Sequence, residues 1–73
     1  MATFIFDNLQ ARTVEVAIEP WAQLVQLETK ARIVIDYDEP ADLDVTLNED
    51  GSVCIGISTE RLRVSAPGLD GSF

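Results

Sequence analysis

The chain has 73 residues, and its 13 acidic and 5 basic side chains give a formal net charge of −8, which repels phosphate and disfavours direct binding of DNA or RNA. Hydrophobic residues make up 47% of the chain, which predicts a folded domain rather than a disordered segment. A domain of this size buries only about 60% of the surface of its unfolded chain, so we expect no large enclosed catalytic pocket in a single copy.

Alternation of apolar and polar residues at period two predicts about seven short strands. The first covers residues 3–6 and is followed by a turn over residues 7–10. The remaining runs, in chain order, span residues 13–19, 22–27, 32–38, 42–48, 52–58 and 61–65. The last segment, 66–73, contains Pro and Gly and reads as a flexible tail. We therefore predict a single β domain over residues 1–65 with a C-terminal tail.

The sequence Asn48-Glu49-Asp50-Gly51 is typical of a three-residue hairpin loop in which Gly51 takes the left-handed conformation. A loop of this length sets Leu47 opposite Val53. Both apolar sets then lie on one face, because an odd loop preserves the side-chain parity of the two strands.

Two further loops are predicted to join their flanking strands as hairpins: an odd loop over residues 38–42, and a four-residue connection over 58–61 that sets Ile57 opposite Leu62. The first of them would set Tyr37 opposite Leu43. The strands between residues 31 and 65 then form a four-stranded antiparallel meander. Short strands with one apolar face each predict an all-β fold, either a small antiparallel β-sandwich or a partly open barrel.

The segment that ends in Glu19-Pro20-Trp21 resembles small uncharacterised bacterial proteins in which a β-strand ends in Glu-Pro-Trp. In those proteins an apolar run and further β-branched strands follow. The matching parts of this chain are residues 14–21, Leu24, Leu27, and the runs 32–37 and 43–47. The resemblance implies a small cupin-like or sandwich-like β domain and brings no catalytic residues.

The side chains that catalysis and metal binding use most often are scarce. The chain has no histidine, and its single cysteine, Cys54, has no partner for a disulfide or a zinc site. The glycines form no phosphate-binding loop. We therefore predict no enzymatic activity, no cofactor and no bound metal.

The first residues carry neither the basic stretch nor the apolar stretch of a signal peptide or a membrane span. A small secreted domain usually needs several disulfides, which one cysteine cannot supply. The predicted location is cytoplasmic, with no membrane partner.

The acidic residues concentrate between Asp36 and Asp50, where the chain has seven acids and no base. The meander would place four of them together on its outward face: Asp36, Asp38, Asp42 and Asp44. Three interpretations remain open for this predicted acidic patch. It could keep the sheet edge from aggregating, bind a basic protein, or hold calcium.

The aromatic residues form the second candidate site, as an interface or a ligand platform composed of Phe4, Phe6, Trp21 and Tyr37. Trp21 has the alternative of plugging one end of the core. The apolar run 4–6 predicts a strand that is covered on both sides or buried between two copies of the chain.

The favoured hypothesis is a non-enzymatic protein-interaction domain that binds another protein or a second copy of itself. One alternative is a cupin-like domain that binds a small ligand, with Trp21 and Tyr37 near the mouth. Another is an acidic inhibitor or immunity-type protein that blocks the active site of a basic partner.

Overall fold

The computed structural model describes residues 1–21 and 23–72. Ala22, which the sequence analysis placed in the third strand, and Phe73 of the predicted tail lie outside the described residues. The described chain forms eight short strands: β1 (Ala2–Asp7), β2 (Val14–Glu19), β3 (Gln23–Leu27), β4 (Arg32–Tyr37), β5 (Leu43–Leu47), β6 (Val53–Ile57), β7 (Leu62–Ala66) and β8 (Leu69–Ser72). The predicted all-β class is confirmed.

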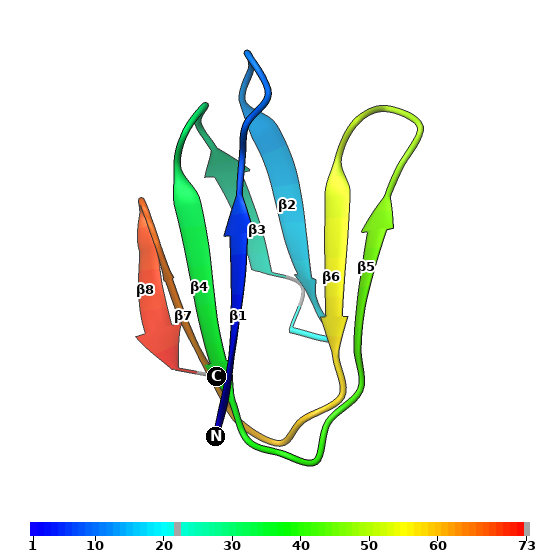
Figure 1. Ribbon diagram of the computed structural model, residues 1–73, viewed down its shortest axis with the longest axis vertical. Helices are drawn as coiled ribbons and strands as arrows, with labels where there is room; N and C mark the ends of the chain where they lie inside the picture. Colours follow the sequence, from blue (N-terminus) through cyan, green and yellow to red (C-terminus); the bar gives the residue numbers. More distant parts are fainter. Residues whose placement is uncertain (22, 73) are drawn as a thin grey trace.

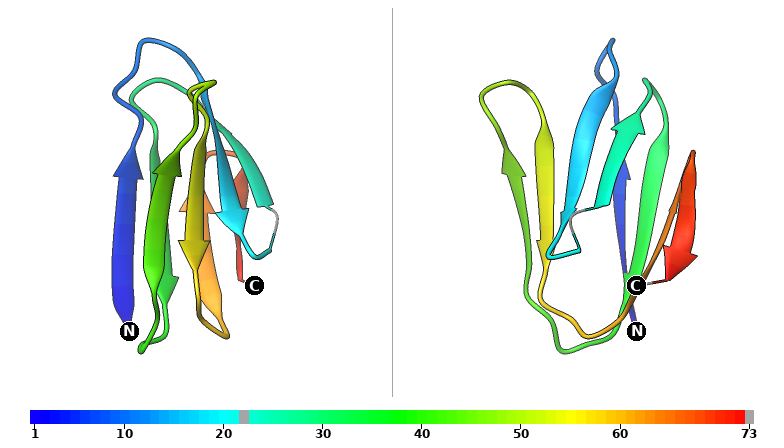
Figure 2. Two further views of the ribbon diagram at one scale, coloured as in Figure 1. Left: turned by 90° about the vertical axis from the view of Figure 1, so that its right-hand side faces the viewer. Right: turned by 180° about the vertical axis from the view of Figure 1, so that it is seen from behind.

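The strands form two four-stranded sheets that face each other (Figures 1 and 2). Sheet A has the order β1-β4-β7-β8, and sheet B has the order β3-β2-β6-β5. Neighbouring strands are antiparallel except β2 and β6, which run parallel. The two sheets are not closed into a barrel, so the sandwich alternative is confirmed. The parallel pairing of β2 with β6 departs from the predicted antiparallel arrangement.

The core lies between the sheets and consists of the inward side chains of the alternating runs. The buried apolar residues are Val14, Val16, Ile18, Val25, Leu27, Ile33, Ile35, Val53, Ile55, Ile57, Leu62 and Val64. β2, β4, β6 and β7 supply ten of these twelve residues, and each has a neighbour on both sides within its sheet. The period-two alternation therefore identified the buried face of these strands correctly.

The predicted meander over residues 31–65 is wrong. β4 pairs with β1 and β7, whereas β5 pairs with β6, so the loops 38–42 and 58–61 cross from one sheet to the other. Tyr37 is thus paired with Leu62 and Ala2, not with Leu43. Alternation cannot distinguish the two arrangements, because a crossover between facing sheets also turns both apolar faces inward.

The predicted tail is wrong for residues 69–72, which form β8 and pair with β7. Pro67 and Gly68 occupy a tight turn in which Gly68 has a φ of 82°. This positive φ favours glycine, and the turn brings Leu69 back against the core.

The part of the chain that the structure describes contains no helix long and apolar enough to cross a membrane.

Candidate interaction surface

The β5–β6 hairpin stands at one side of the sandwich, at the right in Figure 1. Its turn has the predicted form: the Asn48 amide donates to the Ser52 carbonyl at 2.8 Å, and the Gly51 amide donates to the Asn48 carbonyl at 2.9 Å. Gly51 has a φ of 89°. The predicted register of Leu47 opposite Val53 is confirmed.

The two strands of this hairpin carry the same apolar pattern but differ in exposure. In β6, Val53, Ile55 and Ile57 are 5%, 0% and 2% exposed. In β5, their partners Leu47, Val45 and Leu43 are 74%, 47% and 36% exposed. The six side chains share one face of sheet B because directly opposite residues point the same way. The inward face of β5 is therefore left largely uncovered.

An apolar groove of about 530 Å³ lies along this uncovered face. We call it the open groove; its apolar wall consists of Phe6, Leu9, Val14, Val45, Leu47 and Val53. β1 and β5, the terminal strands of the two sheets, lie on the same side of the sandwich in Figure 2 (left). The open groove thus occupies the gap between the two sheet edges, where the sandwich is not closed.

The outer edge of β5 has no strand beside it in the described chain. Asn48 and Asp42, at the two ends of β5, exchange backbone hydrogen bonds with the β6 side: Asn48 N to Ser52 O at 2.8 Å and Ser58 N to Asp42 O at 2.9 Å. Antiparallel ladders alternate, so every second residue of β5 turns its N–H and C=O the other way. These residues are Leu43, Val45 and Leu47, whose backbone groups face the free edge.

Asn8 fixes one end of the open groove. Its side chain is buried, and its Nδ2 donates to the carbonyls of Arg12 and Leu27, both at 2.9 Å. Its Oδ1 accepts from the Gln10 amide at 2.9 Å, and its backbone amide donates to the Ala31 carbonyl at 3.0 Å. The β1–β2 loop is thereby tied to the end of β3 and to the turn that follows. Sequence reasoning missed this role, because an asparagine in a turn has the same sequence signature whether exposed or buried.

Arg12 links that loop to the β5–β6 turn. Its guanidinium occupies the space that a Cβ at position 51 would need, so it packs directly on Gly51. In the same turn the Ser52 hydroxyl and amide donate to Asp50 Oδ1 at 2.6 and 2.9 Å. These hydrogen bonds, and to a smaller extent the charge of Arg12, hold the pKa of the Asp50 carboxyl below its usual value.

A second charged contact lies on the outer face of sheet A. Arg32 donates to both carboxylate oxygens of Asp7 at 2.6 and 3.0 Å. This bidentate pair lowers the pKa of Asp7 and raises the pKa of Arg32, since each charged form stabilises the other. Asp7 is therefore already paired and leaves little free charge at its end of the open groove.

The predicted acidic patch is not formed. Asp36 lies on sheet A, where it accepts a hydrogen bond from Thr3 Oγ1 at 2.7 Å and is paired in register with Arg63. Asp44 lies on sheet B opposite Gly56, not opposite Asp36. The pairing between them failed because it depended on a hairpin between β4 and β5, and these strands belong to different sheets.

The other two acids of that prediction lie in the crossover between the sheets. Asp38 forms an ion pair of 3.4 Å with Arg61 and accepts a backbone hydrogen bond from Thr59 Oγ1 at 3.0 Å. Asp42 accepts at its backbone carbonyl from Ser58. Residues 1–21 and 23–72 contain no group of three acidic or thiol side chains arranged to hold a metal ion. The calcium interpretation required the four carboxylates to lie together on one face, and the structure does not place them there.

The four aromatic residues of the predicted platform all pack against the core and are half-buried: Phe4, Phe6, Trp21 and Tyr37. Phe6 also contributes to the wall of the open groove. Tyr37 lines a separate depression with Arg61 and Arg63. The structure thus brings one of the four to the uncovered face of β5.

Cys54 lies on the outer face of sheet B, is partly exposed, and forms no disulfide within the described chain.

No protein-family model, curated protein or solved structure matches this chain. The resemblance to bacterial Glu-Pro-Trp proteins therefore stays a prediction.

Proposed function

We propose that this chain is a non-enzymatic protein-interaction domain that binds its partner at the open groove. The observation that carries the proposal is the exposure of the inward face of β5. Leu47 is 74% exposed although its cross-strand partner Val53 is buried. A contiguous apolar face beside a sheet edge is typical of surfaces that another protein covers.

The free edge of β5 supports the same proposal. An edge strand offers a row of unpaired backbone donors and acceptors, which is the template used when a partner adds a strand to a sheet. In β5 these groups belong to Leu43, Val45 and Leu47, the residues whose side chains line or flank the open groove. Backbone hydrogen bonds and apolar burial are thus available to one and the same partner segment.

The hypothesis of a small-ligand domain has less support, because it places Trp21 and Tyr37 at one mouth. Both side chains pack against the core, and Tyr37 borders a depression with a polar rim of Asp36, Asp38 and Arg61. The open groove is the more apolar surface and combines with a free strand edge.

The test is affinity capture from a lysate of the source cells with the full chain and two matched variants. Leu47→Ser removes an exposed leucine from the open groove. Leu24→Ser removes a leucine that is 61% exposed on the outer face of sheet B. Both positions are solvent-exposed, so both variants should fold, which circular dichroism would check.

We expect a protein retained by the wild type and by Leu24→Ser but lost with Leu47→Ser. Equal recovery with all three chains, or no protein retained above the uncoated matrix, would contradict the proposed function.

A further inference from the structure

The two sheets differ in charge. The strands of sheet B carry Glu15, Glu19 and Asp44 and no lysine or arginine. Sheet A carries Arg32 on β4 and Arg63 on β7, so its outer face has both signs. Along the chain, residues 33–60 contain eight acids and no base. The β5–β6 hairpin lies in the middle of this purely acidic stretch.

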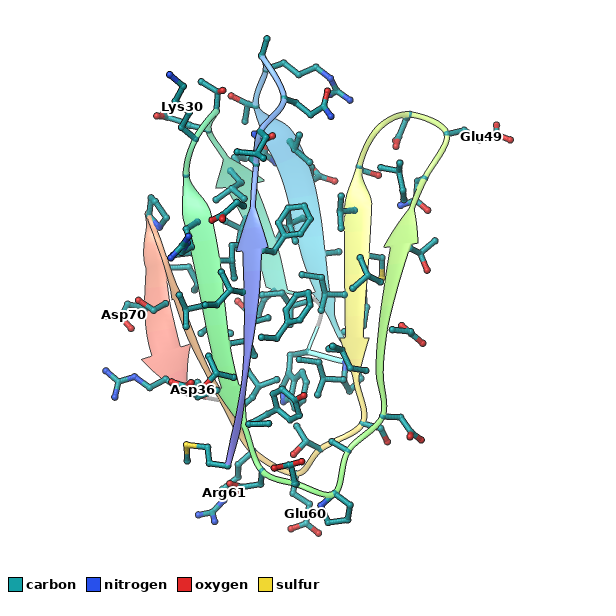
Figure 3. All side chains as sticks on the ribbon, in the orientation of Figure 1. Lys30, Asp36, Glu49, Glu60, Arg61 and Asp70 are labelled. Carbon is teal, nitrogen blue, oxygen red and sulfur yellow. The ribbon has the colours of Figure 1, made fainter. Side chains whose placement is uncertain are left out.

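Several carboxylates around β5 form no ion pair among the described residues. The ion pairs among the described residues join Asp7 to Arg32 and Asp38 to Arg61. Asp42, Asp44 and Glu49 take part in neither. Figure 3 shows Glu49 at the tip of the β5–β6 turn, pointing away from the body of the molecule.

Asp44 is the acid nearest the middle of β5. A Cβ added at Gly56 would stand 2.5 Å from Asp44 Oδ1, so the carboxylate lies across the glycine on the outer face of sheet B. Side chains of β5 alternate between the two faces. The apolar side chains of β5 therefore point toward the open groove, and the carboxylate of Asp44 lies on the other face of the same strand.

We propose that the partner segment is an extended strand of alternating apolar and basic residues that pairs with the free edge of β5. This inference rests on the proposed function. The added strand would continue sheet B, so its side chains would alternate at the same period of two. One set packs beside Val45 and Leu47 in the open groove, and the other set lies beside Asp44. Only an apolar set in the groove and a cationic set beside the carboxylates complement both faces.

A second copy of the chain fits this edge less well. Pairing β5 with β5 of another copy would place Asp42, Asp44 and Glu49 of both chains along one seam. Like charges on adjacent strands destabilise a sheet, and each copy carries a net charge of −8. β5 and the β5–β6 turn contain no base, and Arg12, which packs on Gly51, forms no ion pair with these acids among the described residues.

The experiment titrates the isotope-labelled full chain with three acetylated and amidated peptides. The cationic alternating probe is Lys-Val-Lys-Val-Lys-Val-Lys. The first control is Glu-Val-Glu-Val-Glu-Val-Glu, which keeps the alternation and reverses the charge. The second is Lys-Lys-Val-Val-Val-Lys-Lys, which keeps the composition and removes the alternation. NMR chemical shifts and amide hydrogen exchange locate the bound peptide on the chain.

We expect the cationic alternating peptide to protect the amides of Leu43, Val45 and Leu47, and to bind at least about tenfold more tightly than either control. Asp44→Lys should weaken its binding by about tenfold, whereas Asp70→Lys, on the outer face of sheet A, should change it by less than about twofold. Asp70 lies on the sheet away from β5 (Figure 3). Higher ionic strength should weaken the wild-type complex, because the salt screens these charges.

Each other result overturns the inference in a recognisable way. Equal or tighter binding of the acidic peptide at β5 would contradict the cationic partner and leave the proposed function standing. Shifts centred on another strand would contradict β5 as the docking edge. Protection of the β5 amides without peptide, with a doubled mass in solution, would identify a second copy as the occupant. Equal capture of the partner protein by the wild type and by Leu47→Ser, in the experiment described above, would contradict the proposed function itself.

Discussion

β5 and β6 are two strands of one hairpin, and they show that an apolar pattern does not tell whether the inward side chains of a strand are buried. Each strand places three aliphatic side chains on the same face of sheet B, in register with one another. β6 lies between β2 and β5, and its three side chains are buried in the core. β5 ends the sheet, and its three side chains are exposed. The pattern therefore identifies the inward face, whereas the other sheet decides whether that face is covered: β3 also ends sheet B, but its Val25 and Leu27 are buried.

The largest expected effect is the difference in stability between matched substitutions in β6 and in β5. Ile55→Ala should lower the free energy of unfolding by about 2–5 kcal/mol, because it leaves a cavity in a packed core. Leu47→Ala should cost less than about 1 kcal/mol, since most of that side chain already contacts water. Leucine and isoleucine are isomers, so both changes delete the same atoms. Urea unfolding measures both values, and equal costs would mean that β5 is covered in solution.

A second effect concerns the loop at the end of the open groove. Asn8→Ala removes three side-chain hydrogen bonds and leaves buried backbone groups unpaired, so it should cost about 2–3 kcal/mol. The matched control is Asn48→Ala. Asn48 is exposed in the β5–β6 turn and bonds only to the Ser52 hydroxyl with its side-chain amide, so this change should cost less than about 1 kcal/mol.

Similar losses for the two asparagine variants would contradict the role of Asn8 as the tie between the β1–β2 loop and β3. Thermal unfolding followed by circular dichroism is sufficient for this comparison.

The smallest expected effect is the pH dependence of the turn that joins β5 to β6. The pKa of Asp50 is lower in the folded chain than in the unfolded chain. Its contribution to stability is therefore present above the unfolded pKa of about 3.9 and is lost as the pH falls through the folded pKa. Asp50→Asn should lower Tm at neutral pH, and the difference from the wild type should shrink in acid. A difference that is constant with pH would show that the carboxylate charge does not matter in this turn.

Much of the fold follows from the sequence because strand periodicity and hairpin turns are local properties. The strands around Val16, Ile35 and Ile55 were predicted from alternation, and the 48–51 turn was predicted from its glycine. The pairing of strands across sheets was not predictable, since the loops 38–42 and 58–61 satisfy the same parity whether they form hairpins or crossovers.

The candidate surface was less predictable than the fold. The acids at positions 36 and 44 were expected together, but the two sheets separate them. The exposure of Leu47 depends on how far the facing sheet covers β5, and the burial of Asn8 depends on which loops meet. Both are properties of the tertiary structure, and no residue type or spacing in one sequence encodes them separately.

The most direct test of the central claim is amide hydrogen exchange on the free chain at low concentration. If the edge and inward face of β5 are uncovered, the amides of Leu43, Val45 and Leu47 exchange rapidly, while those of Asp44 and Thr46, which face β6, are protected. This alternating pattern within one strand is the predicted result. Protection of all five amides would contradict the account, because it would mean that the free edge of β5 is already paired.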